Sequence, residues 1–182
     1  MKSRLKNLYK YLIENRKHEV NGWHKAYRDF YSQVAQIRER ITSGEGLSQN
    51  DEAFLKQLLY EKSNGIASRG QSVLSNDNFQ SFIKNKNFIS ALEKFILIPN
   101  SENFTIFSDS WSNQGKSNNP VLVNRVAAAC TLEVSTTVDS GKFNQVFSWL
   151  IREGIIPAYP AEENQSWFAK NIFLLKSIKS EF

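Results

Sequence analysis

Apolar residues recur three and four positions apart along most of this 182-residue chain, and this spacing constrains the fold more than any other feature. In an α-helix such positions share one face, whereas a strand places alternate residues on one face. Helical spacing recurs from segment to segment, and strand-like alternation is confined to "EVSTTV" at 133–138. The chain is therefore predicted to be all-α, a compact multi-helix bundle of about seven to eight helices with at most this one short β-like segment.

Residues that start and stop helices set the expected boundaries. Helices are expected over 3–17 and from about Gly22 to Ser43, where "GEG" at 44–46 ends the second. Further helices are predicted to start at N-caps such as Ser48 and Ser75, and at Pro120. The last long ones are expected to bury apolar sets including Phe143, Val146, Phe147, Leu150 and Ile151, then Trp167, Phe168, Ile172, Leu175 and Ile178.

Charge divides the chain unevenly. Residues 1–28 contain eight Lys or Arg against two Glu, a net of +6, although the whole chain carries only +5. We therefore expect a basic pair of long helices over 1–46 and a Phe-rich helical domain over 47–182, with a single domain as the alternative.

Composition points to an ordinary folded protein. Apolar residues make up 41%, enough to fill a core, and no apolar run reaches membrane-span length. The charged amino terminus is unlike a signal peptide, and a single cysteine, Cys130, suits a reducing compartment. A cytoplasmic location without membrane contact is expected.

The segment "SWSNQGKS" (110–117) ends like a phosphate-binding P-loop but fails the full pattern. Ser110 stands where the motif needs its first glycine, and an amphipathic helix, not a buried strand, is expected before it. A solvated loop between two helices is the favoured interpretation.

No catalytic or metal-binding constellation is predicted. His18, His24 and Cys130 lack the spacing of a zinc site, and Cys130 follows three alanines, as a small core residue would. We therefore expect no enzymatic activity and no cofactor.

The basic amino-terminal face is the strongest positive signal. Cations at helical spacing, with Trp23, Tyr27 and Tyr31 nearby, are what phosphate neutralisation and base stacking require. A solvated amphipathic helix, with Trp23 and Tyr27 in the core, is the alternative. The predicted DNA-binding set from this region is Lys2, Lys6, Lys10, Arg16, Lys17, Lys25 and Arg28.

The loop "SNGIASRGQSVLS" (63–75) could also present polar groups, with Asn64, Arg69 and Gln71 reaching phosphates or base edges. Arg69 and Gln71 are added to the predicted DNA-binding set from this loop. A structural turn built on its glycines is the favoured interpretation of the loop.

Four segments carry a resemblance to a known family. "YEKSNGIASRGQSVLS" (60–75), "PVLVNRVAAAC" (120–130), "STTVDSGKFNQVFSWL" (135–150) and "WFAKNIFLL" (167–175) together resemble the region before the motor in McrB-like proteins, the AAA+ GTPases of modification-dependent restriction systems. The similarity covers roughly residues 60–180 and includes no catalytic motif.

The resemblance implies an amino-terminal DNA-recognition domain in an anti-phage protein. A GTPase motor would follow Phe182, and the parent protein would engage an McrC-type nuclease subunit. The best-known DNA-reading domains of this family are mixed or β-rich, whereas this sequence is helical, so no reader residue can be transferred.

Two hypotheses follow. The first is a non-catalytic helical DNA-recognition or docking module of an McrB-like restriction protein. The second is a helical protein-interaction or regulatory domain without nucleic-acid binding, with an apolar groove around Phe79, Phe82, Phe88 and Trp111.

Overall fold

The computed structural model describes residues 6–7, 10–11, 14–15, 17–68, 70, 72, 74–114 and 119–180. Within these residues the chain forms eight α-helices and no strand, which confirms the predicted all-α bundle. The helices are α2 (Lys17–Thr42), α3 (Glu52–Leu55), α4 (Asn76–Lys84), α5 (Lys86–Leu97), α6 (Ser101–Ser112), α7 (Pro120–Cys130), α8 (Ser140–Arg152) and α9 (Trp167–Lys179). None of the helices in the described ranges is both long and apolar enough to cross a bilayer.

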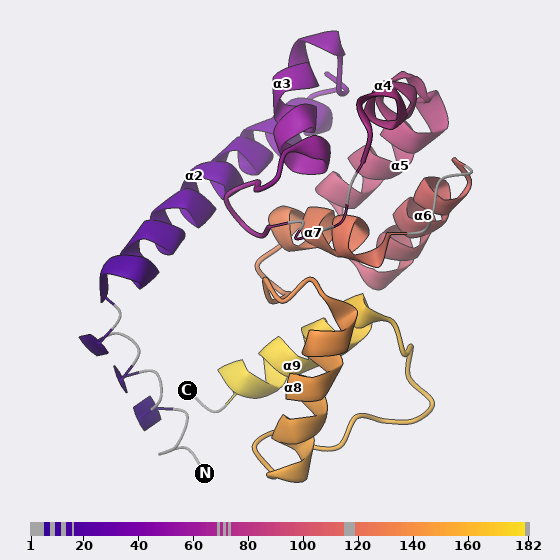
Figure 1. The fold of residues 1–182 in the computed structure, drawn as a ribbon. Coiled ribbons are helices and arrows are strands. Elements are labelled where there is room, and N and C mark those ends of the chain that lie inside the picture. Colours follow the sequence, from indigo (N-terminus) through magenta and orange to yellow (C-terminus); the bar gives the residue numbers. More distant parts are fainter. Residues whose placement is uncertain are drawn as a thin grey trace.

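Helix α2 runs along one side of the molecule, and only its carboxyl-terminal half meets the other helices (Figure 1). Helices α3 to α7 gather around that half, with α5 and α7 in direct contact with α2. Helices α8 and α9 pack on each other beyond α7, at the opposite end of the bundle (Figure 1).

Aromatic rings form the centre of the bundle. Phe95 of α5 is fully buried and contacts the rings of Phe104, Phe107 and Phe168 at centroid distances of 5.7 to 5.9 Å. Phe168 comes from α9, so its ring joins the last helix to α5 and α6 in the core. Ring pairs at these distances add stabilisation beyond simple burial.

The groove expected by the protein-interaction hypothesis is not present. Phe79, Phe82, Phe88 and Trp111 are each at most 1% exposed. Phe82 packs edge-on against Trp111 with 4.8 Å between centroids, and Phe88 completes the cluster. Helical spacing identified these residues as one cluster but could not distinguish a groove from a filled core.

Two of the three helix starts named above, Ser75 and Pro120, are confirmed, whereas Ser48 does not cap α3, because a 3-10 turn intervenes and Asp51 is the N-cap. The Ser75 hydroxyl accepts from Asn78 N, and the Asp139 carboxylate accepts from Lys142 N at 2.8 Å. Pro120 opens α7 as predicted. The expected start of the second helix at Gly22 is wrong, because α2 begins at Lys17 and continues through this glycine. Val146, predicted to be buried, is 51% exposed because α8 turns Phe143, Phe147 and Leu150 inward.

The helix expected to start at Ser48 is irregular. It consists of a 3-10 turn η1 (Gln49–Asp51), α3, and a π-helical turn η2 (Lys56–Tyr60). The buried Arg125 of α7 donates to the carbonyl oxygens of Leu58 at 2.9 Å and Glu61 at 2.5 Å. These bonds satisfy carbonyl groups at the end of the helix, so the chain leaves helical geometry before Asn64.

Segment 133–138, predicted to be β-like, is an irregular connection. Side chains of α7 and α9 hydrogen-bond to the backbone of this segment. Asn171 Oδ1 accepts from Ser135 N, and Asn124 Nδ2 donates to Val138 O, both at 2.9 Å. Val134 and Val138 are buried and anchor the segment to the core. The β-branched residues therefore fill space without a partner strand.

The division of the chain after residue 46 stays a prediction. Phe30, Val34 and Ile37 of α2 belong to the same buried cluster as α5 and α7, which favours the single-domain alternative.

Candidate nucleic-acid interface

The amino-terminal half of α2 extends away from the core. Phe30 is the first buried residue among the side chains of α2 whose burial the structure describes, and we call the stretch before it, residues 17–29, the α2 arm. At 1.5 Å per residue the arm is about 20 Å long. Among the described side chains of the arm, Gly22, Lys25, Arg28 and Asp29 are exposed, so this part of the helix surface is open to a partner.

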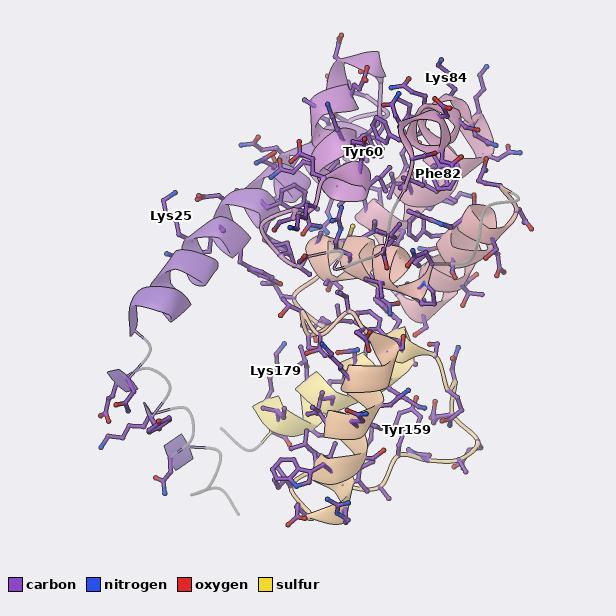
Figure 2. The ribbon with its side chains drawn as sticks, viewed as in Figure 1. Lys25, Tyr60, Phe82, Lys84, Tyr159 and Lys179 are labelled. Atoms are coloured by element: carbon purple, nitrogen blue, oxygen red, sulfur yellow. The ribbon has the colours of Figure 1, made fainter. Side chains whose placement is uncertain are left out.

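Two of the predicted cations share the outer face of this helix. Lys25 and Arg28 are exposed and lie opposite the buried face that includes Phe30. Figure 2 shows Lys25 pointing away from helices α3 to α7. Ser32 and Gln36 continue the same face with hydrogen-bonding groups that are also exposed.

Neighbouring carboxylates partly neutralise these cations. Lys25 Nζ lies 2.6 Å from Asp29 Oδ2, and Lys10 Nζ lies 3.9 Å from Glu14 Oε1. Both are exposed pairs one helical turn apart, a geometry that contributes only about 0.3–0.5 kcal/mol. A phosphate can compete for either lysine, although the acidic residues lower the local positive potential.

The remaining predicted residues are placed only in part. Lys6 and Lys10 are exposed in short helical stretches before α2. The side chain of Lys17 is not among the described features. Lys2, Arg16, Arg69 and Gln71 lie outside the described residues, as does the Gly115–Ser117 triplet. The helical context predicted for that triplet is confirmed, because α6 precedes it and α7 follows it.

Tyr27 belongs to the base of the arm. It is half-buried against the core, and its ring stacks on Tyr31 with 6.4 Å between centroids. Burial, and secondarily the neighbouring Tyr31, raise the pKa of Tyr27 to about 12. This matches the core interpretation of Tyr27 and makes the residue a poor platform for stacking a nucleotide base.

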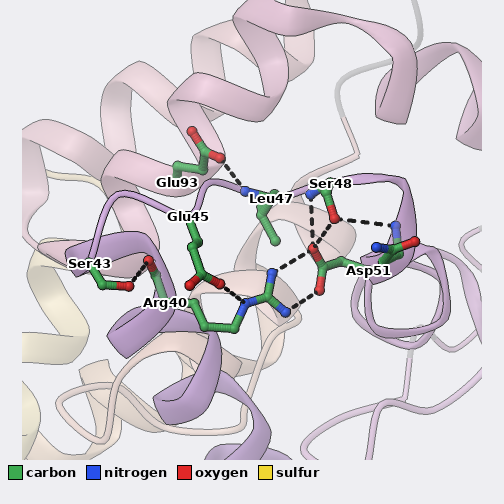
Figure 3. A network of polar contacts seen from close by, with 8 residues as sticks. Arg40, Ser43, Glu45, Leu47, Ser48, Asp51 and Glu93 are labelled. Atoms are coloured by element: carbon green, nitrogen blue, oxygen red, sulfur yellow. Dashed lines mark hydrogen bonds and ion pairs between the residues drawn. The ribbon is translucent and has the colours of Figure 1, made fainter.

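Two arginines fix the carboxyl-terminal half of α2 to the bundle. Arg38 donates from Nε to Ile96 O and from Nη2 to Cys130 O, both at 2.7 Å, so it ties α2 to the ends of α5 and α7. Arg40 holds Asp51 through both carboxylate oxygens (Figure 3). The bond to Arg40, aided by Ser48, holds the pKa of Asp51 below its usual range against the opposing effect of burial.

The loop after η2 packs against the arm. Asn64 is buried, and its Oδ1 accepts from Ile66 N and Ala67 N in a local turn. Gly65 has φ of +80°, and a Cβ there would lie 3.1 Å from the carbonyl oxygen of Ala26. The structural interpretation of Asn64 and Gly65 is therefore confirmed.

Cys130 is a core residue. It is fully buried, and burial raises the pKa of its thiol to about 12, which suppresses the thiolate that a nucleophile requires. Among the described side chains, no three His, Cys, Asp or Glu groups come together as metal ligands.

Sequence reasoning missed one exposed face. Trp149 of α8 is 45% exposed, and Lys142 on the same helix borders a hollow of about 760 Å³ with Ser68, Ser72 and Thr137. In the helical repeat of α8, Trp149 lies off the face that carries Phe143, Phe147 and Leu150. This spacing in the sequence could have identified Trp149 as exposed.

No protein-family model, curated protein or solved structure matches this chain. The McrB-like family membership expected from the sequence therefore stays a prediction.

Proposed function

We propose that this chain is a non-catalytic helical DNA-docking module, in which the α2 arm lies against the phosphates of a duplex. The observation that carries the proposal is that α2 exposes Lys25 and Arg28 on the face opposite Phe30. The major groove of B-DNA, about 12 Å wide, admits an α-helix. Lys6 and Lys10 supply further positive charge before the arm.

The wider role rests on the sequence resemblance. In this proposal the module belongs to an McrB-like anti-phage restriction protein and delivers DNA to a GTPase motor in the same parent protein. An McrC-type nuclease subunit would then be recruited through that parent. In this proposal the DNA carries a modified base or a defined site. The arm's phosphate contacts position the duplex without reading its sequence.

Fluorescence anisotropy of a labelled duplex with the full chain tests the proposal. Binding should weaken steeply with salt, by about 10³ between 50 and 200 mM if six phosphates are contacted. The double variant Lys25→Glu/Arg28→Glu should lose at least about tenfold in affinity at low salt, because two attractive contacts become repulsive.

Lys84→Glu/Lys94→Glu is the matched control, since it changes the net charge equally at exposed positions outside the α2 arm. It should retain most of the binding. Equal loss in both double variants would indicate a non-specific charge effect. Absence of binding to plain and methylated duplexes at low salt would leave the protein-interaction hypothesis in its place.

A further inference from the structure

A cavity of about 520 Å³ opens between α3, α4, α5 and the connection that precedes α3. Its floor is apolar and consists of Leu47, Leu55, Ile83 and Ile89. Polar and charged side chains surround this floor, and no residue of the α2 arm contributes to it. Cavities of this volume, mostly apolar with a few polar groups, are typical of sites for small organic ligands. We call it the α4–α5 cavity.

Four charged side chains line the cavity, and their signs are separated along it. Lys86 opens α5, and Glu93 lies on the same face of this helix, about 10 Å away along its axis. Lys84 ends α4, one turn after Gln80, whose amide donates to Glu52 Oε1 at 3.2 Å. Both lysines therefore lie at the turn between α4 and α5, and both carboxylates lie farther from it.

These four charges do not neutralise one another. Among the described residues, none of Glu52, Lys84, Lys86 and Glu93 forms an ion pair. The two lysines and Glu52 are exposed, whereas Glu93 is half-buried. Unpaired charges of opposite sign at the two ends of an apolar floor are complementary to a zwitterion with an apolar body.

Glu93 is positioned to receive the cationic end of such a ligand. Its Oε1 accepts from Leu47 N at 2.5 Å, and no described group donates to Oε2 (Figure 3). Gly46 allows this close approach, since a Cβ at Gly46 would lie 2.8 Å from Oε1. A carboxylate accepts several hydrogen bonds, so Oε2 can accept from an ammonium while Oε1 keeps its bond to the backbone.

The opposite end of the cavity favours an anion. Lys86 is the first residue of α5, where the helix dipole adds partial positive charge to that of the two lysines. Asn85 Oδ1 already accepts from the backbone N of Asn87 and of Phe88. The contacts to a ligand carboxylate would therefore come from the lysine side chains.

We infer that the α4–α5 cavity binds a short apolar peptide with free termini. The peptide's ammonium pairs with Glu93, its carboxylate contacts Lys84 and Lys86, and its side chains cover Ile83 and Ile89. An extended chain spans about 3.3–3.6 Å per residue, so a peptide of about three residues matches the separation of the two ends. A single amino acid is too short to reach both. The inference does not depend on the proposed DNA binding.

Calorimetric titration of the full chain with the tripeptide alanyl-leucyl-alanine tests the inference. Acetylating the peptide's amino terminus should weaken binding about tenfold, because a charge-assisted bond to half-buried Glu93 is lost. Amidating its carboxyl terminus should weaken binding about threefold, a smaller factor because the lysines are exposed. Both factors should be measured against the uncapped peptide in the same buffer.

Variants of the protein should reproduce these losses end by end. Glu93→Gln should weaken binding of the uncapped peptide about tenfold and leave the acetylated peptide unaffected. Lys84→Gln/Lys86→Gln should weaken binding of the uncapped peptide about threefold and leave the amidated peptide unaffected. Lys94→Gln is the matched control, since Lys94 is an exposed cation of α5 that does not line the cavity, and it should change nothing.

Ser90→Trp provides a second variant that keeps all four charges. Ser90 lines the cavity at an exposed position, so an indole ring there should cover the floor and abolish binding of every peptide. Thermal unfolding of each variant checks that the fold is intact.

The inference is overturned if the uncapped, acetylated and amidated peptides bind equally well. Unchanged affinity in folded Glu93→Gln protein overturns it as well, and so does free leucine that binds as tightly as the tripeptide. Absence of tripeptide binding at a concentration of about 1 mM also counts against it. Duplex binding measured in parallel reports separately on the α2 arm, so loss of either proposal leaves the other intact.

Discussion

Arg40 donates hydrogen bonds to both carboxylate oxygens of Asp51, with Nη1 2.8 Å from Oδ1 and Nη2 2.9 Å from Oδ2 (Figure 3). Asp51 is only 5% exposed, and its Oδ2 also accepts from the backbone N of Ser48. The bidentate pair joins the last turn of α2 to the start of α3. The pair therefore helps to hold the carboxyl-terminal end of α2 against the bundle.

Replacing Asp51 by Asn should lower the free energy of unfolding by about 2 kcal/mol, because hydrogen bonds to a charged partner are lost from a buried site. Chemical denaturation at pH 7 measures this. Glu45→Gln is the control: Glu45 also faces Arg40, but at 3.8 Å and 72% exposed, so its removal should change little. Equal effects of the two variants would contradict the special role of Asp51.

The same pair gives a pH dependence with a defined sign. The pKa of Asp51 is lowered in the folded protein, so the unfolded chain takes up a proton first as the pH falls. The stabilisation should be complete above the unfolded pKa of about 3.9 and lost as the pH falls through the lower folded value. The pH-dependent part of the difference between wild type and Asp51→Asn should therefore be flat from pH 7 to 5 and shrink below pH 4.

Arg125→Leu should destabilise the protein by at least about 2 kcal/mol. The substitution removes the donor that serves the carbonyl groups of Leu58 and Glu61, and groups buried without partners are costly. Loss of the irregular turn η2 should accompany it, seen as faster amide hydrogen exchange in residues 56–61. Lys94→Leu, at an exposed position of α5, provides the control and should shift the unfolding free energy by less than about 0.5 kcal/mol.

Two glycines should respond in opposite directions to alanine. Gly22 lies inside α2 with open space around its Cβ position, so Gly22→Ala should stabilise the arm by up to about 1 kcal/mol and raise helical circular dichroism. Gly65→Ala should instead destabilise the fold, because φ is +80° and the new Cβ would press on the Ala26 carbonyl. Thermal unfolding measures both effects: relative to wild type, the midpoint should rise for Gly22→Ala and fall for Gly65→Ala. A lower midpoint for Gly22→Ala would mean that the arm is not helical at this position.

Local signals predicted most of the fold. The N-cap at Ser75 and the opening proline of α7 were predictable because their chemistry involves residues within one helical turn. The errors came from contacts distant in sequence. Arg125 donates to Glu61 O at the end of a helix more than sixty residues away. Asn171 accepts from Ser135 N, in a segment that local propensity assigns to a strand.

The candidate sites were less predictable for a related reason. Sequence spacing placed Lys25 and Arg28 on a solvent face correctly, but it did not weigh Asp29, one turn away, as a competing partner. Val146 was assigned to the core and Trp149 was not considered. Both residues adjoin the apolar face of α8 formed by Phe143, Phe147 and Leu150, and spacing alone does not show on which side that face ends. The packing of α8 on α9 and on Tyr159 of the connection between these helices determines which side of α8 is covered.

Cys130 should be inert to thiol reagents in the folded protein and react once per chain on unfolding. It is fully buried, and the thiol pKa of about 12 leaves almost no thiolate at pH 8. Reaction with a chromogenic disulfide, followed across a denaturant series, should therefore rise with the unfolded fraction measured by circular dichroism. The chain has one cysteine, so the fully denatured protein sets the end point without correction. Rapid modification under native conditions would require α7 to open locally, and would contradict its place in the core between α2 and α6.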